Sequence, residues 1–259
     1  MGEESEQIKL RIIRIFEKNV KGKSPDLSGY NSMHDGAEGD WLTKQMGLTP
    51  NGRNEPDFEG FEMKKDSTKI TFGDWSPDHS LFKAPARGSK PELTRKEFLQ
   101  IFGTAKTHSD PRRNGRFSWS GKVFPVVNKI NQFGQTMLVN DCEDIQAIYN
   151  FSSDLRPNKK EIIPAKYQID NLELAKWCRA SMKLRVENKF NQLGWFRCVK
   201  NEDGIYDRIV FGKKIDFPIF ISLVRSGKAF CDSGMHDGNN RPYLTWRANK
   251  NVWDELLAE

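Results

Sequence analysis

The stretch PDFEGFEMKK, residues 56–65, places Asp57, Glu62 and Lys64 within eight residues of one another. Alternate side chains of a strand share a face, so Glu62 and Lys64 point the same way while the apolar residues on either side of Glu62 point into the core. Asp57, at the end of the preceding extended segment, can approach Glu62 across the bend. Two carboxylates beside a lysine suit a Mg²⁺ site that acts on a phosphate, although an exposed edge strand with three ordinary charges gives the same pattern.

A helix just upstream adds a further acid. The segment DGAEGDWLTKQMG, residues 35–47, is predicted to be a helix capped by Asp35, which puts Glu38 in its first turn. In the strand downstream, Lys64 would orient or deprotonate an attacking water and offset phosphate charge. The added acid and the correct alternation of apolar residues favour a metal-dependent site over a merely solvated strand.

The order of the predicted elements indicates an α/β fold. Residues 5–19 carry apolar side chains at helical spacing, and the helix at 35–47 is followed by a predicted β-hairpin of residues 56–66 and 69–75. A long helix is expected at 170–190, and strands are expected at 121–130, 136–142, 194–200, 208–214 and 219–225. Helix, helix, hairpin and then mixed elements predict a mixed sheet flanked by helices.

The positive charge of the chain is concentrated in one segment. The formal net charge is +6, whereas residues 83–122 alone carry +7. Within it, KTHSDPRRNGRFSWSGK, residues 106–122, mixes arginines with aromatic residues, which suits a loop that neutralises phosphates, although a solvated surface loop explains the charge equally well. The residues expected to bind the DNA backbone are Lys83, Arg87, Arg112, Arg113 and Arg116.

Composition argues against several other classes of protein. The four cysteines are widely separated without CxxC spacing, so neither structural zinc nor a disulfide framework is expected. The longest apolar run, residues 218–224, is far shorter than a membrane span, and the acidic N-terminus does not resemble a signal peptide. The chain is therefore expected to be cytoplasmic and to act away from membranes.

Four sequence segments together resemble one enzyme family. DGAEGDWL (35–42), PDFEGFEMK (56–64) and ITFGDWSP (70–77), followed near the C-terminus by SGMHDGNNRPYL (233–244), are similar to the MvaI/BcnI restriction endonucleases. That family is related to the mismatch-repair nickase MutH. The matched segments cover less than a third of the chain, in the family's order.

The resemblance implies a fold and a division of labour. It implies a MutH-like PD-(D/E)XK nuclease fold, with a central mixed β-sheet flanked by helices and two lobes that form a DNA-binding cleft. The catalytic lobe would comprise about residues 1–82 with parts of 123–200, and the DNA-recognition lobe about residues 83–122 and 201–259. Both lobes would belong to a single restriction-endonuclease-like domain, residues 1–259.

The resemblance also implies roles for individual residues. Asp57 and Glu62 become ligands of Mg²⁺, Lys64 the catalytic lysine and Glu38 an auxiliary catalytic acid. His236 becomes a residue that reads a guanine edge in the major groove. One relative reads the central base pair with a histidine where this chain has Asp74 or Trp75, so the central-base preference is left open. Further residues expected to contact DNA are Asp74, Arg225, Asp237, Arg241 and Arg247, and either of the last two arginines could supply a bidentate contact to guanine.

The function implied is that of a Mg²⁺-dependent type II restriction endonuclease. It would act as a monomer on double-stranded DNA at a short CC-N-GG-like site, in the cytoplasm of a prokaryote, beside a cognate DNA methyltransferase. The alternatives are a MutH-like repair nickase and a catalytically inert DNA-binding module. The complete set of Glu38, Asp57, Glu62 and Lys64 argues against the inert module.

Overall fold

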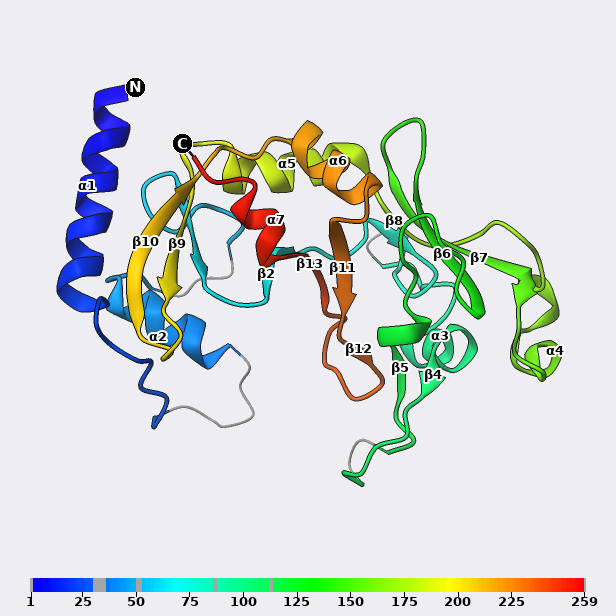
Figure 1. Ribbon diagram of the computed structural model, residues 1–259. Coiled ribbons are helices and arrows are strands. Elements are labelled where there is room, and N and C mark those ends of the chain that lie inside the picture. The colour runs from blue at the N-terminus through cyan, green and yellow to red at the C-terminus, as the bar shows by residue number, and fades with distance from the viewer. Residues whose placement is uncertain (1, 30–35, 50–52, 86–87, 112–113, 259) are drawn as a thin grey trace. The chain divides into compact units, whose positions relative to one another are not determined.

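The computed structural model describes residues 2–29, 36–49, 53–85, 88–111 and 114–258. The chain divides into two compact units, and both are built from segments that are distant in sequence. Unit 1 comprises Met1–Ile70, Leu184–Phe217 and Ala248–Glu259, and unit 2 comprises Thr71–Lys183 and Pro218–Arg247. Figure 1 gives the labels used below.

Unit 1 is a small mixed sheet with helices on both faces. Strand β1 runs parallel to β9, and β10 is antiparallel to β9, which gives the order β1-β9-β10. The sheet is therefore mixed, as the sequence predicts. Its elements are α1 (Gly2–Asn19), α2 (Ala37–Gln45), β1 (Phe61–Lys65), the second half of α5 (Arg179–Phe190), β9 (Gly194–Lys200), β10 (Tyr206–Gly212) and α7 (Lys250–Asp254).

Each face of this sheet is covered by a different pair of helices. On one face, α1 and α2 bury an apolar cluster against Phe61 and Phe196 of the strands. On the other face, the Trp253 ring of α7 packs edge-on against Trp195 of β9, 4.9 Å between centroids, and lies 6.0 Å from Phe190 of α5. Side chains of β1 are consequently buried on both sides of the strand.

Unit 2 contains three further sheets, with strand orders β11-β13-β2, β12-β5-β4 and β3-β8-β7-β6. Its core is rich in aromatic rings, and the buried amide of Gln135 is satisfied by Trp119 Nε1, at 2.7 Å, and by the carbonyl of Phe102. Its elements are β2 (Lys69–Asp74), β3 (His79–Ser80), α3 (Arg95–Phe102), β4 (Thr104–Ala105), β5 (Phe117–Trp119), η1 (Gly121–Val123), β6 (Phe133–Val139), β7 (Ile145–Asp154), α4 (Lys159–Ile162), η2 (Ala165–Tyr167), β8 (Leu172–Trp177), α6 (Phe217–Arg225), β11 (Ala229–Ser233), β12 (Met235–His236) and β13 (Leu244–Asn249).

The hairpin predicted for residues 56–66 and 69–75 is wrong, although both strands exist. β1 pairs with β9, more than 120 residues away, and β2 lies next to β13. A strand buried on both faces takes whichever neighbour completes the core, and proximity in sequence does not decide that choice. Three other expected elements also differ, at 121–130, 170–190 and 219–225.

These three differences have separate physical causes. Residues 170–190 divide into strand β8 and helix α5, because the first half alternates and only the second half keeps a helical period. Residues 219–225 belong to helix α6, since a short apolar run fits a buried helix as well as a buried strand. At 121–130 only the short η1 helix and isolated bridges form, around Pro125, which has no N–H to donate to a strand.

The helices expected at 5–19 and 35–47 are confirmed as α1 and α2. No helix in the described part of the chain is both long and apolar enough to cross a membrane. The residue ranges of the two compact units differ from those of the catalytic and recognition lobes expected from the sequence. The division of function between lobes stays a prediction.

Candidate active site

A tight turn brings Asp57 beside strand β1. Phe58 and Phe61 exchange two backbone hydrogen bonds across Glu59 and Gly60, which both have positive φ, 43° and 95°. Two consecutive residues with positive φ are typical of a type I′ turn, and glycine adopts this conformation without strain. The chain therefore folds back, and Asp57 Oδ2 accepts a hydrogen bond of 3.0 Å from the backbone N–H of Met63.

Glu62 and Lys64 form a buried ion pair on the face of β1 that α5 and α7 cover. Lys64 Nζ donates to Glu62 Oε1 at 2.7 Å, and the two residues are only 7% and 2% exposed. The ammonium group lies 5.0 Å from the centre of the Phe190 ring and 5.9 Å from that of Trp253. The sequence prediction that Glu62 and Lys64 share a face, with Asp57 next to them, agrees with this arrangement.

Helix α7 is itself anchored to the strands beneath it by two ion pairs, each of which joins a buried charge to a partly exposed one. Arg197 of β9 is hydrogen-bonded to Asp254, and Lys250 Nζ lies 2.7 Å from Oδ1 of Asp66, which follows β1. Lys250 also donates its backbone N–H to the carbonyl of Thr68. Because breaking a buried pair leaves an uncompensated charge, these contacts hold Trp253 over Lys64.

A second lysine reaches the same carboxylate, and nothing in the sequence marks it. Lys189, in the last turn of α5, places its Nζ 3.0 Å from Glu62 Oε1. That oxygen therefore faces two ammonium groups, while Glu62 Oε2 is buried and has no hydrogen-bond partner among the described residues. Lys189 is about 125 residues from β1 in the sequence, so its contact with Glu62 is found only in the folded structure.

The environment of these groups shifts their protonation. Burial, followed by the charge of Glu62, raises the pKa of Asp57 to about 6. Burial lowers the pKa of Lys64, against the opposing effect of Glu62. A divalent cation would stabilise two carboxylates that raise each other's energy in this way.

The donor atoms fit a hard divalent cation. Glu62 Oε2 lacks a partner, Asp57 is held at its side, and carboxylate oxygens are the ligands that Mg²⁺ prefers. No group of three or more His, Cys, Asp or Glu side chains suited to a metal occurs in the part of the chain that the structure describes. Such an ion would therefore take its remaining ligands from water, backbone or substrate.

Glu38 lies on the opposite face of β1 from Glu62. Its Oε1 accepts hydrogen bonds of 2.8 Å from Lys200 Nζ and from the Tyr206 hydroxyl, and Lys65 Nζ is 3.8 Å from Oε2. Lys65 alternates with Lys64 along the strand, so its side chain points to the α2 side. The structure thus brings Asp57, Glu62 and Lys64 together, whereas Glu38 lies on the opposite face of the strand.

In unit 2, His236 and Asp237 are fixed against the end of the basic segment. β12 pairs with β5, and Asp237 exchanges hydrogen bonds with the backbone of Phe117, N to O at 3.0 Å and N to Oδ2 at 3.2 Å. The His236 ring accepts a hydrogen bond from Gly238 N–H at Nδ1, 3.0 Å, and Nε2 lies 2.9 Å from the Asn239 amide. Burial and the charge of Arg116 lower the pKa of His236, which favours the neutral ring.

The other residues expected to read bases are held in ion pairs. Arg241 Nη1 lies 2.7 Å from Asp74, which also accepts a hydrogen bond from Leu244 N–H. Arg247 lies 3.3 Å from Asp232. Arg225 lies 3.6 Å from Glu143. Since exposed pairs of this kind contribute little, each arginine can exchange its partner for another anion or acceptor.

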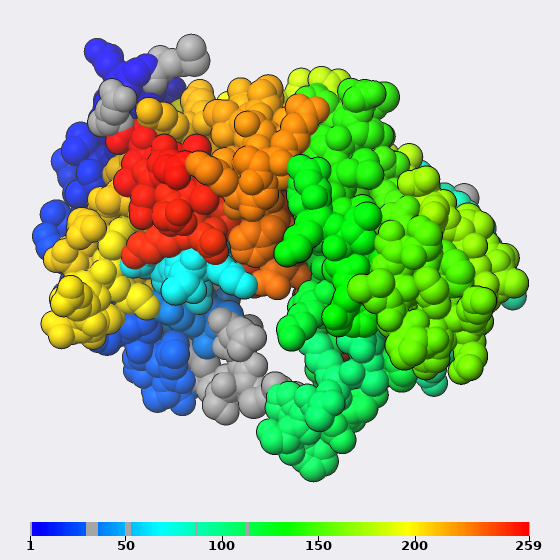
Figure 2. Space-filling model, turned by 45° about the vertical axis from the view of Figure 1, so that its right-hand side comes forward, coloured from blue at the N-terminus to red at the C-terminus, as the bar shows by residue number. Residues whose placement is uncertain are grey.

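The basic segment is only partly described. Arg87, Arg112 and Arg113, like the cap residue Asp35, lie outside the described residues. The hairpin of β4 and β5, which ends beside Arg116, projects from the rest of unit 2 (Figures 1 and 2).

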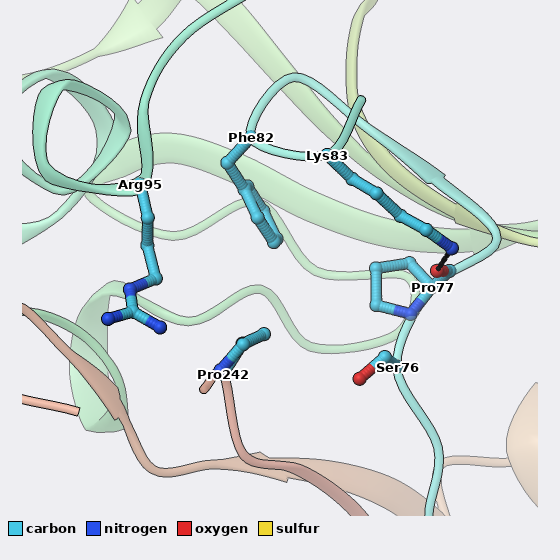
Figure 3. A pocket seen from close by; sticks show the side chains of 6 residues that line it. All are labelled: Ser76, Pro77, Phe82, Lys83, Arg95 and Pro242. Atoms are coloured by element: carbon cyan, nitrogen blue, oxygen red, sulfur yellow. Dashed lines mark hydrogen bonds between the residues drawn. The ribbon is translucent and has the colours of Figure 1, made fainter. Parts of the chain in front are cut away.

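Lys83 is exposed, and its ammonium group is hydrogen-bonded to the backbone of the same segment. Its Nζ donates to the carbonyl oxygens of Pro77 and Asp78, both at 3.0 Å. Lys83 and Arg95 line a pocket of about 310 Å³ (Figure 3). The other residues lining it are Ser76, Pro77, Phe82 and Pro242.

Comparison with known proteins places this chain among restriction enzymes. The family model described as LlaMI restriction endonuclease matches residues 20–259. The chain belongs to the LlaMI restriction endonuclease family. It is also 42% identical over 268 residues to the type II restriction enzyme ScrFI of Lactococcus lactis subsp. cremoris, a match covering 97% of each chain.

The fold of this family member is similar to that of a solved restriction endonuclease. The structure of MvaI in complex with its cognate DNA substrate superposes with a TM-score of 0.59, at 12% sequence identity, over 100% of this chain and 98% of the MvaI chain. The resemblance drawn from the sequence motifs is thereby confirmed as a similarity of fold.

The LlaMI-family chain is a type II restriction endonuclease, that is, a site-specific deoxyribonuclease. The expectation of an enzyme of this class is confirmed. The roles of individual residues, the metal and the recognition site stay predictions.

Proposed function

We propose that this restriction endonuclease hydrolyses double-stranded DNA with the help of a Mg²⁺ ion held by Asp57 and Glu62. The observation that carries the proposal is the buried, unpaired Oε2 of Glu62, next to an aspartate whose pKa is raised to about 6. Leaving such an acceptor without a partner is costly, and a cation removes that cost.

Lys64 is proposed as the residue that handles the attacking water. When bound, Mg²⁺ stabilises the charge that develops on a phosphate and lowers the pKa of a coordinated water. The pKa of Lys64 is lowered by burial, so more of its amine is unprotonated at neutral pH, and able to act as a base, than that of a surface lysine. The contact with Glu62 holds the amine in one position.

Glu38 supports this site from the other face as an auxiliary acid. It pairs with Lys200 and Lys65, which lie at the same end of the two paired strands as Lys64. Removing Glu38 would take an ion-pair partner from the two lysines and the hydrogen-bond acceptor from the Tyr206 hydroxyl.

Base reading is assigned to residues 225–247. His236 would read guanine N7 or O6 with Nε2, which has to leave the Asn239 amide nitrogen to do so, while Nδ1 keeps its hydrogen bond from Gly238 N–H. Asp237, Arg241, Arg247 and Arg225 would complete the base contacts, at a CC-N-GG-like site whose central base is read near Asp74.

Backbone contacts are assigned to the basic segment, residues 83–122. Lys83, Arg87, Arg112, Arg113 and Arg116 would neutralise phosphates, in a cleft formed by a catalytic and a recognition lobe of a MutH-like fold. The enzyme would act as a monomer in the cytoplasm of a prokaryote, whose own DNA a cognate methyltransferase protects.

Incubation of supercoiled plasmid with Mg²⁺ tests the proposal. We expect discrete linear fragments from the wild-type protein, whereas open circles alone would indicate a nickase and unchanged, gel-shifted plasmid an inert binding module. Sequencing the fragment ends gives the recognition site and the stagger together. A site unlike CC-N-GG would contradict that part of the proposal.

The variant Asp57→Ala should lose cleavage while still binding DNA. A metal contributes several kcal/mol to such a reaction, so the rate should fall by about 10³-fold or more. Glu55→Ala, which removes an exposed acid two residues away, is the matched control and should cut normally. Normal cutting by Asp57→Ala would refute the assignment of the metal site.

A further inference from the structure

Glu62 Oε1 is shared by two lysines, and the proposed chemistry uses only one of them. Lys64 Nζ lies at 2.7 Å and Lys189 Nζ at 3.0 Å from this oxygen. Both lysines also act electrostatically on Asp57. Asp57, Glu62, Lys64 and Lys189 together are close to neutral, so the second lysine balances the second carboxylate while no metal is bound.

The two ammonium groups differ in their freedom to move. Lys64 is enclosed between the Phe190 and Trp253 rings, and its side chain is 8% exposed. Lys189 projects from the last turn of α5, its side chain is 17% exposed, and its ion pair is with the same Glu62. A lysine head group on a flexible four-carbon stem can swing between partners, and Lys189 is the one placed toward solvent.

The charge balance changes when the site is loaded. A divalent cation on Asp57 and Glu62 uses the carboxylates that Lys189 otherwise neutralises. An ammonium group beside a dication then requires a new anion. The anion that would enter this site in the reaction is the scissile phosphate, and Lys189, with 17% of its side chain exposed against 8% for Lys64, is the more accessible of the two lysines.

We propose that Lys189 is a second catalytic lysine, which pairs with Glu62 in the unloaded enzyme and with a non-bridging oxygen of the scissile phosphate in the DNA complex. There it stabilises the negative charge that builds up on the phosphate during attack. This inference rests on the proposed metal site at Asp57 and Glu62. It predicts that removal of Lys189 slows cleavage without weakening metal binding.

Lys189→Met tests both effects in the full-length protein. Titration of the unloaded protein with Mn²⁺, followed by the electron paramagnetic resonance signal of the free ion, should show affinity equal to wild type or a few times tighter, because a competing cation is gone. The single-turnover cleavage rate at saturating DNA and Mg²⁺ should nevertheless fall by about tenfold or more. Lys189→Arg should recover part of that rate, and Lys183→Met, on an exposed lysine of the same helix, should match wild type.

Tighter or unchanged Mn²⁺ binding combined with slower cleavage supports the proposal, because a purely structural lysine would not separate the two. Cleavage within twofold of wild type, or weakened Mn²⁺ binding, overturns it. If Lys189→Met does not fold, Lys189→Gln, which keeps a hydrogen bond to Glu62 without the charge, is judged by the same two measurements. Asp57→Ala separates this inference from the metal site itself: if that variant is inactive while Lys189→Met is normal, only the role of Lys189 fails.

Discussion

The face of β1 in unit 1 and residues 225–247 in unit 2 hold their charged residues in opposite ways. Glu62 and Lys64 are 2% and 7% exposed, and aromatic rings enclose their ion pair. Arg241 and Arg247 have 58% and 35% of their side chains exposed, and each has an acidic partner at the surface. The enclosed Glu62–Lys64 pair is difficult to break, whereas exposed pairs are exchanged at little cost.

This difference matches the two tasks of a site-specific nuclease. Chemistry benefits from charges that are fixed before substrate arrives, because nothing then has to reorganise during the reaction. Reading a sequence requires side chains that leave one partner for a base edge, and do so only on the correct site. The comparison therefore predicts that changes on β1 affect cleavage of every DNA sequence, while changes within residues 225–247 affect discrimination between sequences.

Outside the metal site, the largest effect is expected for His236→Ala. Loss of one good base contact costs about 1–3 kcal/mol of discrimination, so cleavage of the preferred site should fall by roughly 10–100-fold. Cleavage of duplexes carrying each substitution at the guanine positions measures this. Uniform loss on all duplexes, instead of relaxed preference at one base pair, would contradict a reading role, and His79→Ala, an exposed histidine of the same unit, is the control.

A smaller effect is expected for the pH dependence of stability, measured by denaturant unfolding in the presence of a chelator. The pKa of Asp57 is raised to about 6, above its ordinary 3.8. The folded state therefore holds a proton that the unfolded state has lost, and stability falls as pH rises from about 4 through 6. The amide introduced by Asp57→Asn does not titrate, so the free energy of unfolding of this variant should rise relative to that of wild type by about 2 kcal/mol between pH 4 and pH 8. Glu55→Gln should show no such gain, and parallel pH profiles for Asp57→Asn and wild type would refute the buried environment of Asp57.

The smallest effect is expected for Arg116→Ala, at the end of the basic segment. If Arg116 contacts one phosphate, its loss should weaken binding of all sequences by less than about tenfold and reduce the salt slope of log K by about 1. Electrophoretic or fluorescence binding at several salt concentrations, with Ca²⁺ to prevent cutting, provides the measurement. Lys129→Ala, on an exposed lysine outside the segment, is the matched control, and an unchanged slope for Arg116→Ala would move the phosphate contacts elsewhere.

The sequence by itself determined the local geometry of the site. Strand alternation places Glu62 and Lys64 on one face, and the Glu59–Gly60 turn folds Asp57 back to Met63. Helical spacing likewise predicted α1 and α2. These features depend on residues within one or two turns of each other, so the sequence specifies them directly.

Only the tertiary structure decided which distant segments complete the site. It pairs β1 with β9 instead of β2, brings Lys189 to Glu62, and places Glu38 behind the strand. The alternation of β1 is the same whichever strand lies beside it, and the sequence around a lysine in a helix does not indicate which residue that lysine contacts. Those choices follow from how segments more than a hundred residues apart bury their apolar faces together, which no local pattern records.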